Sequence, residues 1–143
     1  MSSTDVRSTN VRTALDHLFE AFDDHDADRA VAAYAPDVRF RMHSSGTELV
    51  GPEAVHAMHG QLFDAFSDAH TKVLEVIDAG DVVVFEFELL GTNDGPYMGL
   101  DATGRSVNVR VCDVVRFDGD GRIISEDNYM DSLSMARQLG LAG

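Results

Sequence analysis

Hydrophobic and polar residues alternate most regularly in the last third of the chain. From Val107 to Phe117 nearly every second residue is apolar, and Asp113 occupies one of these apolar positions. A period of two is typical of a β-strand that buries one face. The turn residues 118–121 and a second strand at residues 123–131 follow directly, so the pattern predicts a hairpin of two long strands.

Apolar residues at helical spacing predict three helices before this hairpin and one after it. The first helix follows a polar arm, residues 1–9, which we expect to be flexible. The second is short and is expected to stop at Pro36. The third begins at Pro52, and its apolar stripe includes His59. A final short helix is predicted at residues 132–141.

Three further strands are predicted at residues 37–43, 70–77 and 82–90, with loops at 44–51 and 91–105. Helices therefore come first, and antiparallel strands follow as a group. That segregation predicts an α+β fold, with a curved antiparallel sheet packed against the N-terminal helices and enclosing a pocket. We expect residues 10–143 to form a single domain.

The composition narrows the possible partners. A formal net charge of −14 over 143 residues argues against nucleic acid and anionic membrane surfaces, because both require a basic surface. Cys112 is the single cysteine, so neither an internal disulfide nor a cysteine metal cluster is expected. The sequence shows no membrane span and no signal peptide, which predicts a cytoplasmic location.

Two aspartates on the predicted hairpin are the first candidates for chemistry. If the two strands keep an unbroken period of two, Asp113 and Asp127 project into one interior from neighbouring strands. A carboxylate on an apolar face is costly unless it is paired or neutralised, and a raised pKa would suit it to proton transfer. The alternative is a structural role, in which these aspartates pair with Arg110, Arg116 or backbone amides at the edge of a strand.

His59 is the third candidate, because it lies on the apolar stripe of its helix. It could orient a substrate or pass a proton, whereas a core histidine hydrogen-bonded to a neighbour is the alternative. His56 and His59 have the spacing of helical metal ligands, but they fall on different faces, so no metal site is expected.

Several short motifs together resemble the SnoaL-like branch of the NTF2-like superfamily. They are Gly91-Thr92 before a glycine-rich loop, Ala102-Thr103-Gly104-Arg105 at the start of a long strand, Asp113 followed by Val-Val-Arg-Phe, the turn from Asp118 to Ile123, and the terminal Gln138-Leu139-Gly140. The resemblance covers roughly residues 10 to 141. The sequence departs from the family pattern at Asn93, where the loop motif commonly has histidine.

The resemblance implies a cone-shaped fold, a homodimer formed through the sheet, and an enzyme that uses neither metal nor cofactor. In the cyclases of this family an aspartate on the last long strand is the acid/base residue, and Asp127 stands there by our alignment. Asp113 matches a pocket-facing position that is often polar. Met42 and Leu18 stand where ketosteroid isomerases place their base and their oxyanion tyrosine, which argues against that activity.

These observations predict a cofactor-independent acid/base enzyme of the cyclase or isomerase type, acting on a small hydrophobic carbonyl metabolite such as a polyketide. Asp127 would take a proton from carbon, and Asp113 with His59 would stabilise the enolate. The residues expected to contact the substrate are Phe19, Phe22, Tyr34, Met58, Phe63, Phe85, Phe87, Val111 and Tyr129. The alternatives are a non-catalytic protein that binds a hydrophobic ligand, and an epoxide hydrolase or dehydratase that uses the same carboxylates.

Overall fold

The structure is a computed structural model that describes residues 3–142, with side chains from residue 13 onward. In chain order its elements are α1 (Ser3–Asp23), α2 (Ala27–Val31), β1 (Tyr34–Met42), β2 (Thr47–Val50), α3 (Pro52–Ala65), β3 (His70–Asp78), β4 (Val82–Thr92), β5 (Ser106–Phe117), β6 (Ile123–Met130) and α4 (Ser132–Gln138). The predicted α+β fold is confirmed.

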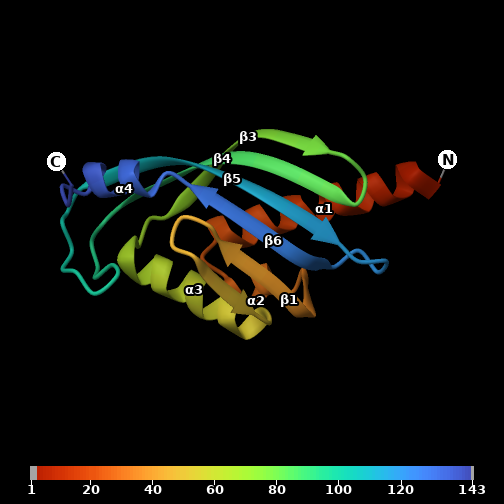
Figure 1. The fold of residues 1–143 in the computed structure, drawn as a ribbon, viewed down its shortest axis with the longest axis horizontal. Helices are drawn as coiled ribbons and strands as arrows, with labels where there is room; N and C mark the ends of the chain where they lie inside the picture. Colours follow the sequence, from red (N-terminus) through yellow and green to blue (C-terminus); the bar gives the residue numbers. More distant parts are fainter. Residues whose placement is uncertain (1–2, 143) are drawn as a thin grey trace.

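The strands form one curved, open sheet in the order β2-β1-β6-β5-β4-β3 (Figure 1). The sheet is mixed, because β1 pairs with β6 in parallel and all other neighbours are antiparallel. The expectation of a wholly antiparallel sheet was therefore wrong at this one junction. Register shifts in β3 and at the start of β6 bend the sheet, since a bulge increases the local twist of its strand.

The predicted hairpin is present and its turn is held by one side chain. Asp118 Oδ1 accepts hydrogen bonds from the backbone N–H groups of Asp120 and Arg122, both at 2.9 Å. Such local bonds favour Asp at the first position of a turn. The third helix begins with Pro52 at its first turn, as predicted, and Asp131 caps α4 by accepting from Ser134 N at 2.9 Å.

Three boundaries differ from the sequence predictions. Pro36 lies inside β1, in the gap of the β1–β6 register between Tyr34 and Arg39, where its missing N–H costs no ladder hydrogen bond. The predicted loop at 44–51 contains the short edge strand β2. Helix α1 begins at Ser3, inside the predicted arm; residues 1–2 lie outside the described part, and the flexibility of the arm stays a prediction.

Helices α1, α3 and α4 pack against one face of the sheet, and α2 packs against α1 and α3. Helix α1 passes behind the long strands, and α2 and α3 lie beside β1 (Figure 1). One core cluster joins α1 to β1, β4 and β5, and a second joins α3 and α4 to the other end of β4 and β5. A pocket remains between these two clusters. No helix among residues 3–142 is long and apolar enough to cross a membrane.

Candidate functional site

The sheet and the helices enclose a cavity of about 310 Å³. This volume lies in the range of small-molecule pockets, and the wall is mostly apolar, as such pockets require. Aromatic rings supply much of the wall, from Phe19, Phe22, Tyr34, Phe40, Phe85, Phe87 and Tyr97. Thioethers supply another part, from Met42, Met58, Met98, Met130 and Met135.

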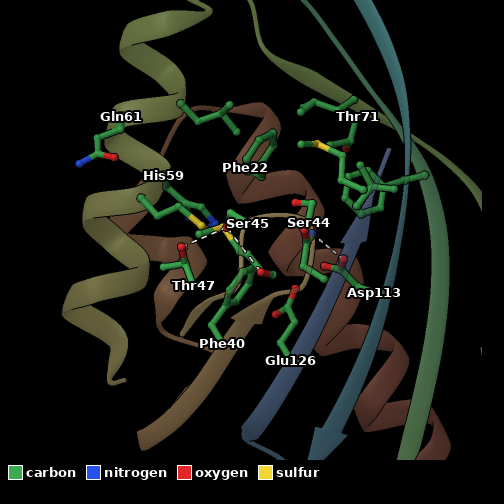
Figure 2. A pocket seen from close by; sticks show the side chains of 18 of the residues that line it. Phe22, Phe40, Ser44, Ser45, Thr47, His59, Gln61, Thr71, Asp113 and Glu126 are labelled. Atoms are coloured by element: carbon green, nitrogen blue, oxygen red, sulfur yellow. Dashed lines mark hydrogen bonds between the residues drawn. The ribbon is translucent and has the colours of Figure 1, made fainter. Parts of the chain in front are cut away.

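The polar centre of the cavity is a pair of carboxyl groups on neighbouring strands. Asp113 of β5 and Glu126 of β6 are each only 3% exposed. Tyr34 Oη donates to Glu126 Oε1 at 2.7 Å, and Asn128 Nδ2 donates to Asp113 Oδ1 at 2.7 Å. Figure 2 shows both carboxyl groups on the sheet side of the cavity, opposite His59 on α3.

The environment of this pair favours the protonated form of Asp113. Burial raises the pKa of Asp113 well above its usual value, and the charge of Glu126 and a hydrogen bond to it raise that pKa further, against a weaker opposing effect of Asn128. The protonated form of Asp113 is therefore favoured, and in that form its hydroxyl can donate a hydrogen bond to Glu126. Burial and the same Glu126 charge raise the pKa of Tyr34, so its phenol remains a donor.

Asp127 does not share this interior, which corrects the predicted pairing with Asp113. The register between β5 and β6 shifts from Arg116↔Ser125 to Phe117↔Ile123, so β6 contains one extra residue near its start. An extra residue exchanges the two faces of a strand from that point onward. Beyond the bulge Glu126 and Asn128 line the cavity, and Asp127 faces the outer side of the sheet.

On the outer face Asp127 forms an ion cluster. Arg41 Nε and His43 Nε2 both lie 2.8 Å from Asp127 Oδ1, and Arg116 Nη1 lies 3.3 Å from Oδ2. Burial alone would raise the pKa of Asp127, but the His43 hydrogen bond and the charge of Arg41 outweigh it and lower that pKa. The structural alternative for this aspartate, a pairing with arginine at the strand surface, fits this geometry.

His59 lines the cavity and is 6% exposed. Its Nδ1 atom is buried without a hydrogen-bond partner among the described residues, unlike a core histidine bonded to a neighbour. Burial, with a smaller effect of His56, lowers the pKa of His59 to about 4, so the ring is neutral at pH 7. His56 points elsewhere and contacts Asp28 at 2.8 Å, so the predicted separation of the two histidines is confirmed.

The depressed pKa of His59 predicts a loss of stability on acidification. The unfolded chain takes up this proton below pH 6.5 and the folded chain only near pH 4, so unfolding becomes more favourable across that window. Between pH 7 and pH 4.5 the free energy of unfolding, measured in urea, should fall for both proteins. We expect the fall to be about 2–3 kcal/mol smaller in His59→Phe than in the wild type. His56→Gln on the same helix is the control. An equal loss in His59→Phe and wild type would contradict this assignment.

Most of the predicted contact residues do line the cavity: Phe19, Phe22, Tyr34, Met58, Phe85, Phe87 and Val111. Two do not. Phe63 stacks on His25 with ring centroids 4.2 Å apart, and Tyr129 stacks on His43 at 4.5 Å on the outer face. The bulge that moved Asp127 also moved Tyr129, because both have the same parity on β6. That any of these residues contacts a substrate stays a prediction.

Sequence reasoning missed Glu126, Asn128 and Phe40, although each lines the cavity. For Glu126 and Asn128 the signal was hidden by the assumption of an unbroken strand. The apolar residues of β6 carry a trace of the bulge, since Ile123 and Met130 are both inward-facing and stand an odd number of positions apart. Phe40 lies on the apolar side of the strand predicted at residues 37–43, and its side chain belongs both to the core and to the cavity wall.

Asn93 anchors the loop that follows β4. It is 1% exposed, and its amide nitrogen donates to Ala65 O at 3.1 Å and Gly95 O at 2.9 Å. Its amide oxygen accepts from Thr103 N at 2.8 Å and Thr103 Oγ1 at 3.0 Å. All four hydrogen-bonding positions of this side chain are therefore filled, and the loop is held where Tyr97 and Met98 line the cavity.

Comparison with known proteins gives a consistent result. The family model described as SnoaL-like polyketide cyclase matches residues 11–139. The chain is 36% identical over 94 residues to aklanonic acid methyl ester cyclase DnrD of Streptomyces peucetius. That match covers 65% of this chain and 64% of DnrD, less than two thirds of the relative's length.

Two solved structures illustrate the similarity of fold. A protein of Jannaschia sp. CCS1 assigned to the SnoaL-like polyketide cyclases has a TM-score of 0.84 at 25% identity, covering 94% of each chain. IdmH of Streptomyces antibioticus, assigned as a polyketide cyclase, has a TM-score of 0.79 at 25% identity, covering 91% of this chain and 98% of IdmH.

Proposed function

The chain belongs to the SnoaL-like polyketide cyclase family, and from this premise we propose that it is a cofactor-independent acid/base enzyme acting on a small hydrophobic carbonyl metabolite. The observation that carries the proposal is the pair of carboxyl groups of Asp113 and Glu126, which lie together inside an apolar cavity where burial and the Glu126 charge raise the pKa of Asp113. A protonated and an ionised carboxyl group side by side provide the acid and the base that such chemistry needs.

The proposed cycle leaves the pair unchanged in total proton count. Ionised Glu126 takes a proton from a carbon next to the substrate carbonyl, while the Asp113 hydroxyl donates a hydrogen bond to the carbonyl oxygen where negative charge develops. The resulting enolate attacks a second carbonyl of the same molecule and forms the new carbon–carbon bond. Asp113 then gives its proton to the new alkoxide, and the proton on Glu126 passes to Asp113.

Three neighbours support this cycle by positioning and charge. Tyr34 and Asn128 each hold one carboxyl group through a 2.7 Å hydrogen bond, which fixes where the proton is donated. His59 lies across the cavity with Nδ1 unpartnered, and it would bind a polar group at the far end of the substrate. Asp127 has no part in the proposed cycle, because it faces the outer side of the sheet.

The name of the relative DnrD supports the substrate class. It describes a cyclase of aklanonic acid methyl ester, which is a neutral ester rather than a free acid. A neutral hydrophobic carbonyl compound suits a cavity whose described lining residues include two carboxyl groups and no lysine or arginine.

A hydrolase or dehydratase is the second candidate function. Water activation requires a polar cluster beside the reacting carboxylate, and Tyr34, Glu126 and Asn128 form such a cluster around Asp113. The two candidates differ in product, because a hydrolase adds water to its substrate and a cyclase does not change the formula of its substrate. A non-catalytic binding protein is a third possibility, and it predicts no chemistry at all.

The test is exchange of carbon-bound hydrogen in D₂O, followed by NMR. We would incubate the protein with 2-tetralone and with larger aromatic ketones and β-keto methyl esters, and measure deuterium at the carbon next to the carbonyl. Exchange well above the buffer rate with at least one compound is expected, since the proton-abstraction step needs no complete substrate. Exchange at the buffer rate for the whole panel would contradict the proposal and favour a binding protein.

We further propose that the protein forms a homodimer through the outer face of its sheet. Helices α1, α3 and α4 pack on the other face, with α2 on α1 and α3, so no helix of the described residues covers the outer face. This face exposes Tyr129, and it sets Arg110 of β5 directly opposite Glu88 of β4, with Glu86 two residues further along β4. Such a surface can complement itself across a two-fold axis.

Light scattering tests the dimer. The wild type is expected at twice the chain mass of 15.6 kDa, and Tyr129→Asp at the chain mass. Leu133→Asp, on the 51% exposed position of α4, is the matched control and should remain dimeric. A monomeric wild type would contradict the proposal.

A further inference from the structure

The cavity contains a negative charge that no basic side chain of residues 13–142 balances. Among the residues whose side chains the structure describes, its lining includes Asp113 and Glu126 but no lysine or arginine. Arg41 of β1 and Arg116 of β5 face the outer side of the sheet and bind Asp127 there. With Asp113 protonated, the pair keeps the single charge of Glu126. His59 is neutral at pH 7 and does not balance it.

An uncompensated charge in an apolar enclosure is energetically costly. Hydrogen bonds from Tyr34 and from the protonated Asp113 lower this cost but do not neutralise the charge. A ligand that brings its own positive charge would neutralise it. The same ligand would gain from aromatic ring faces, which attract cations and line this cavity.

His59 is an independent observation that favours a hydrogen-bond donor as ligand. Its Nδ1 is buried and unpartnered among the described residues, and the side chain lines the cavity. This nitrogen accepts a hydrogen bond when the ring proton is on Nε2. Asn128 uses its N–H on Asp113, which leaves its carbonyl oxygen as a second acceptor. The polar groups at the cavity are thus rich in acceptors, and an ammonium group is rich in donors.

We propose that the pocket binds hydrophobic amines in their protonated form, in competition with the carbonyl substrate. The ammonium group would pair with Glu126, and the apolar body would occupy the aromatic and methionine-lined part of the cavity. The net charge of −14 adds to this preference, because it raises the local concentration of cations and lowers that of anions. This inference rests on the proposed function in one respect, since it uses the same one-proton carboxyl pair.

The experiment compares two compounds that share one bicyclic body. 2-Aminotetralin is protonated at pH 7.5, and 2-tetralol is its neutral counterpart. Isothermal titration calorimetry on the full chain is expected to give at least tenfold tighter binding of the amine. The amine should also inhibit proton exchange of 2-tetralone competitively. Equal affinities for amine and alcohol in the wild type would overturn the inference without the need for any variant.

Three variants locate the charge that selects the amine. Glu126→Gln removes it, and the preference for the amine should fall at least tenfold. Asp113→Asn replaces a group that is already neutral, so the preference should persist. Glu53→Gln, at an exposed position of α3, changes the net charge equally and is the control. A preference that survives Glu126→Gln, or one lost in Asp113→Asn, would overturn the assignment of the charge to Glu126.

The two proposals can fail separately. Amine selectivity is read from binding and acid/base activity from exchange. Selective binding of the amine with no proton exchange would contradict the proposed enzyme activity and support the amine site. Exchange without selective binding would support the activity and contradict the amine site.

Discussion

Asp113→Asn is expected to lower enzyme-catalysed proton exchange by about 100- to 10,000-fold, the range that general acid–base groups contribute. The carboxamide has the shape of the protonated carboxyl group, and it can accept from Asn128 and donate to Glu126 in the same arrangement. The fold should therefore be kept. Proton exchange should be lost, because the carboxamide cannot transfer a proton to the substrate. Exchange rates of 2-tetralone by NMR measure the effect, with circular dichroism as the check on folding.

Glu126→Gln should lose exchange to a similar extent, because the pair acts as a unit and the base is then absent. Asp127→Asn is the matched control on the same strand. It should keep near wild-type exchange while losing about 1 kcal/mol of stability, since the ion cluster is partly exposed. Loss of exchange in Asp127→Asn but not in Asp113→Asn would contradict the assigned site.

Asp113→Asn should also change how the stability of the protein depends on pH. Burial raises the pKa of this carboxyl group in the folded state, so the folded chain holds a proton that the unfolded chain releases as the pH rises above about 4. The wild type therefore loses stability with rising pH through the window between these two pKa values. Asp113→Asn lacks this loss. In urea unfolding at a series of pH values, its free energy of unfolding should therefore rise relative to that of the wild type as the pH increases.

Asn93→Ala is expected to destabilise the fold by about 3 kcal/mol. The substitution removes four hydrogen bonds and leaves Ala65 O, Gly95 O and Thr103 N without their side-chain partner in a buried place. For a chain of this size the melting temperature should fall by roughly 6–12 °C. Ligand binding should weaken as well, because the loop carries Tyr97 and Met98 to the cavity.

Two further variants sharpen the Asn93 experiment. Asn93→Asp has the same shape but directs a carboxylate oxygen at Ala65 O and Gly95 O, so it should be at least as destabilising. Asn108→Ala, at an exposed position of β5, should change stability by less than about 0.5 kcal/mol. A melting temperature of Asn93→Ala equal to that of Asn108→Ala would show that the network contributes nothing.

The elements that the sequence predicted well are those with strong local signals. The turn around Asp118 and the helix start at Pro52 each depend on a few adjacent residues. The buried place of Asp113 and His59 was likewise predictable, because each interrupts a clear apolar stripe.

What could not be predicted depends on contacts between distant segments. Strand β2 has exposed or half-buried residues throughout, so no apolar pattern marks it, and it forms by pairing with β1. The parallel pairing of β1 with β6 joins residues more than eighty positions apart. The bulge in β6 is the decisive case, because a single extra residue decides which carboxyl group meets Asp113.

The bulge in β6 also means that a single mutation could exchange the residues that line the cavity. Downstream of it, each residue's side is determined by counting from Ile123, so losing one codon between Ile123 and Glu126 would turn the rest of β6 over in one event. Asp127 and Tyr129 would then enter the cavity, and Glu126 and Asn128 would leave it. A lineage with this fold thus has two complete sets of candidate site residues encoded on one strand, separated by a single in-frame deletion rather than by a series of substitutions.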